Sequence, residues 1–325
     1  MSKKVVRKIL VTGSTGQIGS ELTLELRKKY GGNNVIAAGH KRQPSETLLK
    51  SGPFEYVDLS VEESIEKIVK QYNIDTVCHL AAVLSANGED NPQAAWGINM
   101  GSLYNVLEVA RKLDLPRVFW PSSIAAFGPT APRINTPQET VLIPTTMYGV
   151  TKVAGELLCN YYFKKYGVDV RSVRYPGIIS SEVLPGGGTT DYAVAIFYEA
   201  IKNRHYTCFV REDTVLPMMY MPDCLKATID LTEADPSKVK RHDSYNVAGV
   251  SFSAGELAAE IRKHIRDFRC DYKPDSRQKI ADSWPMSIDD SVAHKDWGWK
   301  PMYDLAAMTK DMMARLSKRF AEGKL

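Results

Sequence analysis

Short apolar runs alternate with amphipathic stretches along the first half of the chain. Five runs rich in β-branched residues predict strands, at residues 8–13, 34–39, 54–59, 75–82 and 117–123. Apolar positions at helical spacing fill the segments between these runs. Continuous apolar strands joined by helices are typical of a parallel sheet that helices cover on both faces. The pattern therefore predicts an α/β fold with a doubly wound parallel sheet.

Two longer helical patterns follow, at about 91–113 and 145–166, and a further strand is predicted at 168–176. With these elements the chain contains about six strand-helix units by residue 178.

The pattern is less regular in the second half of the chain. Residues 180–193 are rich in glycine and serine, which indicates a loop. A run near 243–248 resembles another core strand, so we expect the chain to return to the first sheet there. We therefore divide the chain into a first domain, 1–178, and a smaller C-terminal lobe that occupies most of 179–325.

The composition is that of an ordinary globular chain. Its 325 residues are 44% hydrophobic and 25% charged, enough for one large domain and a smaller lobe. The net charge of +4 is small and the basic residues alternate with acidic ones, so we expect no nucleic-acid partner. No apolar run approaches the roughly 20 residues of a membrane span, so we expect no membrane association.

The cysteines and histidines do not suggest a metal site. The five cysteines are scattered without a CxxC motif, and the six histidines lack ligand spacing. We therefore expect no metal and no disulfide framework. Such cysteine usage is typical of a reducing, intracellular compartment.

A glycine-rich turn directly follows the first predicted strand. The sequence VTGSTGQIG places Gly13, Gly16 and Gly19 between that strand and the helix that begins near Gln17. Glycines at this place permit a tight turn and let backbone N–H groups approach a pyrophosphate. A plain connecting turn is the alternative. The position in the first strand-helix unit favours a dinucleotide-binding Rossmann domain over residues 1–178.

The choice between NAD and NADP depends on the end of the second strand, where NAD sites usually carry an acid. Here the chain reads Gly39, His40, Lys41, Arg42, and the acid is absent. The basic side chains could accept the 2′-phosphate of NADP, or they could be solvated while the backbone at Gly39 contacts a plain ribose. Asp58 after the third strand is either an adenine contact or a helix cap.

Three kinds of reactive group, a serine hydroxyl, a phenol and an ammonium group, are expected at the same edge of the sheet. Ser122 and Ser123 end the fifth predicted strand, and Tyr148 and Lys152 follow at helical spacing in YGVTK. A tyrosine base near pH 7 needs its pKa lowered by about three units, or about 4 kcal/mol. An ammonium group about 4 Å away supplies about that much at an effective dielectric constant of 20.

These motifs together resemble the extended short-chain dehydrogenase/reductases. The resemblance rests on GxxGxxG, the HLAA strand end, Asn99, a serine on strand five, YxxxK and RYPG. It implies that Tyr148 exchanges a proton with a substrate hydroxyl that Ser123 holds. It also implies that Lys152 binds the nicotinamide ribose and lowers the pKa of Tyr148. The implied cofactor contacts are Gly13, Gly16, Gln17, Ile18, Gly19, Lys41, Asp58, Leu59, Leu80, Ala81, Ala82, Asn99, Tyr148, Lys152, Tyr175 and Ile178.

Within this superfamily, a 4,6-dehydratase would carry an Asp-Glu pair where this chain has Ile124 and Ala125. The stretches RYPGIIS, PGGGTTDYA, LPMMY, IADSWPMSIDDS and DWGWKP resemble the metal-free, short-chain type of L-threonine 3-dehydrogenase. That resemblance implies NAD as cofactor, with NADP second, and L-threonine as substrate. The implied substrate contacts are Ser85, Ser123, Tyr148, Thr189, Thr190 and Trp284.

Several alternatives stay open at this point. Ser85 and the two threonines could merely satisfy loop backbone, and Trp284 could pack between lobes. Arg174 could bind a substrate anion or form a buried ion pair. A nucleotide-sugar epimerase and a non-catalytic dinucleotide-sensing module are the competing functions. The resemblance further implies a homodimer paired through the two long helices, located in mitochondria in a eukaryote and in the cytoplasm in a bacterium.

Overall fold

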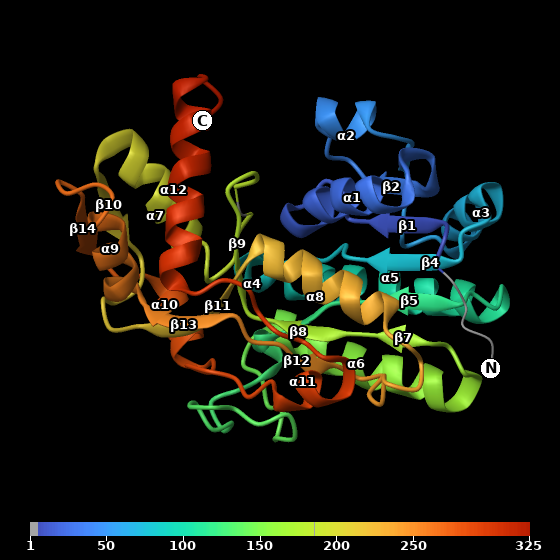
Figure 1. Ribbon diagram of the computed structural model, residues 1–325. Coiled ribbons are helices and arrows are strands. Elements are labelled where there is room, and N and C mark those ends of the chain that lie inside the picture. The colour runs from blue at the N-terminus through green and yellow to red at the C-terminus, as the bar shows by residue number, and fades with distance from the viewer. Residues whose placement is uncertain (1–5, 185) are drawn as a thin grey trace.

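The computed structural model describes residues 6–184 and 186–325, and a parallel sheet forms its centre (Figure 1). Six strands pair in parallel in the order β3-β2-β1-β4-β5-β7. They are β1 (Ile9–Thr12), β2 (Val35–Gly39), β3 (Phe54–Tyr56), β4 (Thr76–His79), β5 (Arg117–Phe119) and β7 (Val170–Arg171). The predicted α/β fold with a parallel Rossmann-type sheet is confirmed.

Three further strands extend this arrangement in the order β12-β8-β6, again in parallel. They are β6 (Ser122–Ser123), β8 (Val173–Tyr175) and β12 (Tyr245–Asn246). The chain thus returns from the second lobe to pair β12 with β8. The domain boundary at residue 178 stays a prediction.

Two of the predicted strands are each split into two short strands. The run 117–123 contains β5 and β6, and the run 168–176 contains β7 and β8. Pro121 lies between β5 and β6 and has no N–H to donate to a sheet ladder. Because of this split, Ser122 and Ser123 form a separate short strand that lies beyond the carboxyl end of β5.

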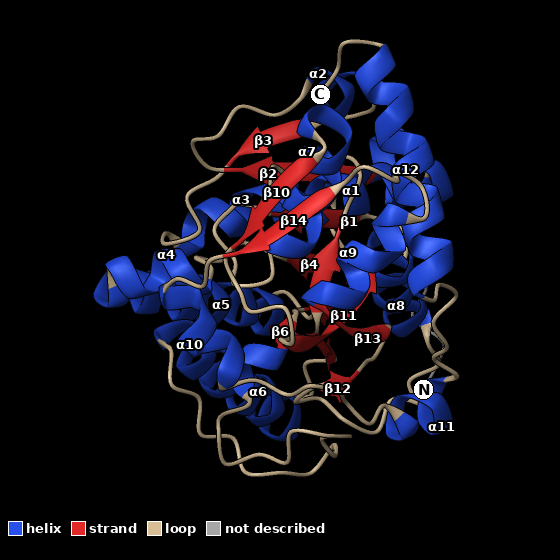
Figure 2. Ribbon diagram, turned by 90° about the vertical axis from the view of Figure 1, so that its left-hand side faces the viewer, coloured by secondary structure: helices blue, strands red, loops and turns tan. Residues whose placement is uncertain are grey.

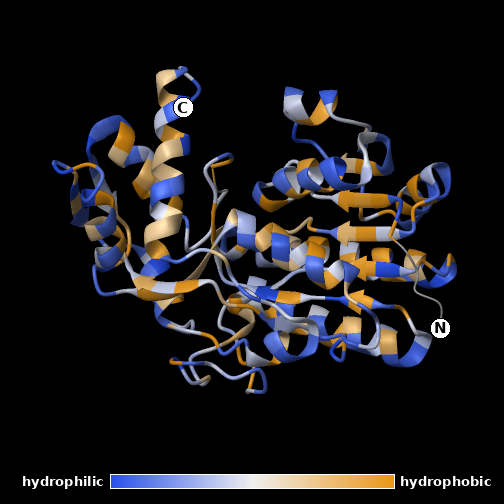
Figure 3. Cartoon of the chain, in the orientation of Figure 1, coloured by the Kyte–Doolittle hydropathy of each residue, from blue (hydrophilic) through white to orange (hydrophobic). Residues whose placement is uncertain are grey.

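Alternate strand residues face opposite layers of helices, as expected for strands buried on both sides. Leu10 and Ile36 contact one layer, and Ile9 and Val11 belong to the core on the other side. The first layer consists of α3 (Glu62–Tyr72), α5 (Pro92–Lys112) and α6 (Met147–Tyr166). The second contains α1 (Gln17–Tyr30) and α8 (Met221–Glu233). Figure 3 shows the sheet strands as mainly hydrophobic and the helices as mixed.

The second lobe has its own core around a small mixed sheet, in the order β13-β11-β9. A separate parallel pair, β10 and β14, lies at the outer edge of this lobe, at the left in Figure 1 and toward the viewer in Figure 2. The strands are β9 (Gly177–Ile179), β10 (His205–Cys208), β11 (Val215–Tyr220), β13 (Val250–Ser253) and β14 (Arg269–Tyr272). The helices are α7 (Tyr192–Asn203), α9 (Ala254–Arg262), α10 (Ser276–Asp282) and α12 (Leu305–Ala321).

Short elements complete the chain. They are η1 (Gly32–Asn34), α2 (Glu46–Lys50), α4 (Ser85–Asp90), η2 (Ile124–Ala126) and α11 (Ser291–Trp297). All five cysteines are free thiols. Among the described residues, the longest helices lack the apolar length that crossing a bilayer requires.

Candidate active site

Tyr148 and Lys152 lie one turn apart at the beginning of α6. Thr146 caps this helix, because its side chain accepts a hydrogen bond from the N–H of Gly149 at 3.1 Å. A Cβ atom at Gly149 would lie only 2.2 Å from the carbonyl oxygen of Ala125. Glycine at this position therefore allows the first turn of α6 to contact the chain directly after Ser123, the last residue of β6.

Lys152 is buried and points at the interruption between β5 and β6. Its ammonium group donates a hydrogen bond to the carbonyl oxygen of Pro121 at 2.6 Å. The same nitrogen lies 4.5 Å from the centre of the Trp120 ring and 5.3 Å from that of Tyr148. Burial lowers the pKa of Lys152 to about 7, although Cys159 and Glu156 raise it.

The phenol of Tyr148 is a weaker acid than an ordinary tyrosine. Burial raises the pKa of Tyr148 to about 12, and the hydrogen bond with Ser123 lowers it. The resemblance implies that Lys152 lowers this pKa, whereas the largest effect on it is burial, which raises it. A further positive charge close to the phenol is needed before Tyr148 can act as a base near neutral pH.

The glycine loop brings β1, β4 and α1 into close contact. Gly13 adopts φ +69°, and a Cβ atom there would lie 2.7 Å from the backbone nitrogen of Ala81. A Cβ atom at Gly19 would lie 2.2 Å from the carbonyl oxygen of Gly13. Gly16 is the N-cap of α1 and provides no side-chain cap. The N-terminus of α1 is therefore open toward the cavity in front of the sheet.

This end of α1 fits a dinucleotide pyrophosphate. The side-chain nitrogen Nε2 of Gln17 is buried and has no hydrogen-bond partner among the described residues. An uncapped helix N-terminus and an unpaired amide donor both favour an anion at this position. The residues present therefore suit a nicotinamide dinucleotide.

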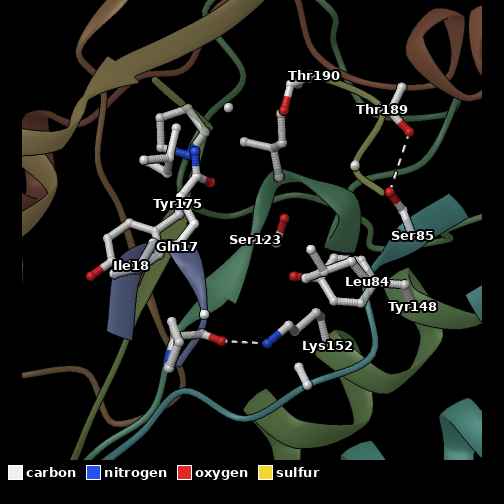
Figure 4. A pocket seen from close by; sticks show the side chains of 18 of the residues that line it. Gln17, Ile18, Leu84, Ser85, Ser123, Tyr148, Lys152, Tyr175, Thr189 and Thr190 are labelled. Atoms are coloured by element: carbon white, nitrogen blue, oxygen red, sulfur yellow. Dashed lines mark hydrogen bonds between the residues drawn. The ribbon is translucent and has the colours of Figure 1, made fainter. Parts of the chain in front are cut away.

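One cavity extends from this helix end to the second lobe (Figure 4). Figure 4 shows Ser123, Tyr148 and Lys152 on the same side of it. Sixteen of the predicted site residues line this cavity: Gly13, Gly16, Gln17, Ile18, Gly19, Leu80, Ala82, Ser85, Ser123, Tyr148, Lys152, Tyr175, Ile178, Thr189, Thr190 and Trp284. The structure thus brings together the predicted catalytic and substrate residues and most of the predicted cofactor residues.

A second cavity lies on the other side of the glycine loop, at the end of β2. It shares Gly13, Gly16, Leu80 and Ala82 with the first cavity. Three more predicted residues line it, namely Lys41, Leu59 and Ala81. In a dinucleotide-binding sheet of this kind, this is the place of the adenosine half of the cofactor.

Two predicted cofactor residues line neither cavity. Asp58 is exposed and its carboxylate accepts hydrogen bonds from the N–H and hydroxyl of Ser60, so it forms a turn before α3 instead of capping that helix. These hydrogen bonds lower the pKa of Asp58. Asn99 is buried and bonds to the backbone of Val83 and to the hydroxyl of Thr151. Cofactor contacts of Asp58 and Asn99 stay predictions.

The loop after β9 forms the far wall of the first cavity. The hydroxyls of Ser85 and Thr189 lie 3.3 Å apart and are both buried. Trp284 lines the cavity and also belongs to the hydrophobic core of the second lobe. The sequence left open whether Trp284 lines the pocket or packs in the protein interior, and in the structure it does both.

Sequence reasoning missed Asp191, the acidic residue of the first cavity's lining. Its carboxylate accepts hydrogen bonds from the N–H groups of Gly187 and Gly188 at 3.0 and 2.8 Å. These bonds hold the loop that carries Thr189 and Thr190. Its position directly after GGGTT and before a helical pattern was the available signal.

Arg174 does not line the cavity. It forms a buried ion pair with Glu156, which settles the alternative that the sequence left open. Within the described residues, no group of three or more histidine, cysteine or acidic side chains could hold a metal ion.

The parallel sheet and the cavity at its carboxyl end define a protein that binds a dinucleotide, and sequence comparison agrees with this class. Residues 9–248 match the NAD dependent epimerase/dehydratase family, and the chain belongs to this family. An uncharacterised epimerase/dehydratase of Staphylococcus haemolyticus is 49% identical over 315 residues, which cover 97% of this chain and 99% of the relative.

Solved structures give a more specific similarity. A GalE-like L-threonine dehydrogenase from Cupriavidus necator, in its holo form, is 53% identical, with a TM-score of 0.93 over 95% of this chain and 99% of that one. A monomeric L-threonine 3-dehydrogenase from a metagenome, in its apo form, is 48% identical, with a TM-score of 0.92 over 95% and 99%.

Proposed function

We propose that this protein oxidises the β-hydroxyl of L-threonine to give 2-amino-3-ketobutyrate, with NAD⁺ as hydride acceptor. The observation that carries the proposal is that Tyr148, Ser123 and Lys152 line one cavity together with Ser85 and Thr189, whose hydroxyls lie 3.3 Å apart. The similarity to L-threonine dehydrogenases at about half identity supports the choice of substrate.

In this proposal, Tyr148 and Ser123 handle the substrate hydroxyl. The tyrosine oxygen takes the hydroxyl proton while the Ser123 hydroxyl holds the substrate oxygen in place. The O–H electron pair forms the new carbonyl as the β-carbon gives up its hydride. A bound, oxidised nicotinamide dinucleotide supplies the hydride acceptor and a positive charge. That charge opposes the effect of burial on the pKa of Tyr148.

The substrate's polar groups would lie against the second lobe. All four predicted substrate residues of this region line the cavity, which supports a role for the hydroxyls of Ser85, Thr189 and Thr190 in binding the amino acid head group and for Trp284 in covering it. A cavity of this kind suits a small zwitterion because its described lining carries one cation, Lys152, and one acidic side chain.

We also propose that the protein forms a homodimer through α5 and α6. Trp96, Tyr104, Leu157 and Tyr161 lie on these helices and are 45%, 49%, 66% and 48% exposed. Large apolar side chains gathered on one surface favour a protein partner, and a two-fold axis would place the same surface of a second copy against it.

The test of the proposed reaction is the absorbance of the reduced nicotinamide, with L-threonine and either NAD⁺ or NADP⁺. Threonine-dependent reduction should fall by about 1,000-fold in Tyr148→Phe, because a positioned acid-base group contributes about that much. Tyr166→Phe, at the exposed end of the same helix, is the matched control and should stay active. No reduction with either cofactor would refute the threonine assignment.

A further inference from the structure

The second cavity has an unusual wall where the adenosine ribose is expected. Gly39 ends β2, and the next three residues that line the cavity are His40, Lys41 and Arg42. None of the residues that line this cavity is acidic. A site that selects NAD generally presents a carboxylate here to the 2′-hydroxyl, and the same carboxylate repels a 2′-phosphate.

At the position that usually carries the acid, a side chain would require its neighbours to move by a few tenths of an ångström. A Cβ atom at Gly39 would lie 3.0 Å from the Phe54 ring and 3.2 Å from the methyl group of Thr15. The carbonyl oxygen of Gly39 also accepts a hydrogen bond from Val57 at 2.8 Å, which holds the backbone. The packing at the end of β2 therefore favours glycine at position 39. The absence of the acid fits this packing.

The three basic side chains are available to an anion. His40, Lys41 and Arg42 are exposed, and none forms a hydrogen bond or ion pair with the described residues. The acidic group whose charge they face is Asp58, which His40 and Lys41 influence from a distance. The carboxylate of Asp58 is already bonded to Ser60 and lies outside the cavity lining.

We propose that Lys41 and Arg42, with His40, form a subsite for the 2′-phosphate of an adenosine ribose. The protein then binds 2′-phosphorylated dinucleotides more tightly than unphosphorylated ones. The inference rests on the dinucleotide site of the proposed function, and it is independent of the threonine assignment. Arginine and lysine are the side chains that bind phosphate, and each exposed cation contributes roughly threefold to fivefold in affinity at low salt.

The test measures binding without turnover. Calorimetry compares adenosine 2′,5′-bisphosphate with adenosine 5′-monophosphate on the full chain. We expect the bisphosphate to bind about tenfold more tightly, and the advantage to shrink as salt screens the exposed cations. In Lys41→Ala/Arg42→Ala the advantage should disappear while the affinity for the monophosphate stays the same.

Lys50→Ala is the matched control, since Lys50 is an exposed lysine on nearby α2 that pairs with Glu46. It should leave both affinities unchanged. Equal affinity of the wild type for the two ligands overturns the phosphate subsite and leaves the dinucleotide site intact. An advantage that persists in the double variant also overturns it. Failure of both ligands to bind overturns the dinucleotide site and the subsite together.

Discussion

Glu156 and Arg174 form a buried ion pair with two parallel hydrogen bonds, from Nε to Oε1 at 2.9 Å and from Nη2 to Oε2 at 2.8 Å. Both side chains are only 3% exposed. Ser122 also donates its hydroxyl to Glu156. The pair therefore ties α6, which carries Tyr148, to β6 and β8 and so fixes the tyrosine beside the strand of Ser123.

Removing one member of this pair should destabilise the folded protein. Arg174→Met leaves the Glu156 carboxylate buried without its partner, and we expect the free energy of unfolding in urea to fall by about 3–5 kcal/mol. The control is Lys28→Met, which breaks a surface pair with Glu25 and should change stability by less than about 1 kcal/mol. Equal effects in the two variants would contradict the prediction.

Lys152→Met should shift the pH dependence of the reaction. The Lys152 nitrogen lies 5.3 Å from the centre of the Tyr148 ring, and because an ionised phenol and a charged lysine stabilise each other, we expect its loss to raise the pKa of the phenol further. We expect the rising limb of the pH-rate profile to move upward by one unit or more, and activity near pH 8 to fall by about 100-fold. Lys164→Met, on the exposed end of α6, should leave the profile in place. An unshifted limb in Lys152→Met would exclude this role.

Glu21 should make the protein less stable as pH rises. It lies on α1 and accepts a hydrogen bond from Ser180, and burial raises its pKa to about 7. Because the folded state holds the proton more tightly than the unfolded state, stability declines between about pH 4.5 and 7, by at most about 3 kcal/mol. Glu21→Gln should flatten this decline in urea titrations at several pH values. Glu25→Gln, one turn later and partly exposed, should keep the wild-type slope.

Gly13→Ala should damage dinucleotide binding. The new methyl group would meet the backbone at Ala81, and the left-handed φ adds strain of about 1–3 kcal/mol. We expect the affinity for the reduced dinucleotide, followed by fluorescence, to fall more than about tenfold. Gly298→Ala has a similar φ of +81° but open space around it. It should lose some stability and retain full binding, and an equal loss of binding in both variants would refute the steric argument.

Leu157→Lys should weaken the proposed dimer. The side chain is 66% exposed in the single chain, so the change should not affect folding, but a second copy would bury the charge. Light scattering after size exclusion should show a dimeric wild type and a monomeric variant. Met302→Lys, at a position 58% exposed outside α5 and α6, should stay dimeric. A monomeric wild type would end the proposal.

The periodic features of this chain were predictable from local sequence. The alternation of apolar runs and helices predicted the confirmed α/β fold, and the spacing of YGVTK placed Tyr148 and Lys152 on one helix face. The split around Pro121 was missed because continuous hydrophobicity outweighed the missing backbone donor. The third predicted strand ends early at Tyr56, since Asp58 prefers a turn.

Contacts between distant segments were not predictable in the same way. Glu156 meets Arg174, and Asn99 meets Val83 and Thr151, only because the sheet order brings their elements together. Asp191 is a similar case, because whether it lines the cavity depends on how the loop after β9 lies relative to the first sheet. Local propensity carries no information about such pairings.

During synthesis on the ribosome, the pairing of β8 cannot be completed until β12 has been made. The strand beside it, β8, ends at Tyr175, but β12 begins at Tyr245, about 70 residues later. At roughly 5–20 residues per second, the nascent first domain spends several seconds with the edge of β8 unpaired. An open strand edge invites pairing with other chains. The step that completes the nucleotide-binding sheet is therefore also the step that ends the period of greatest exposure to aggregation.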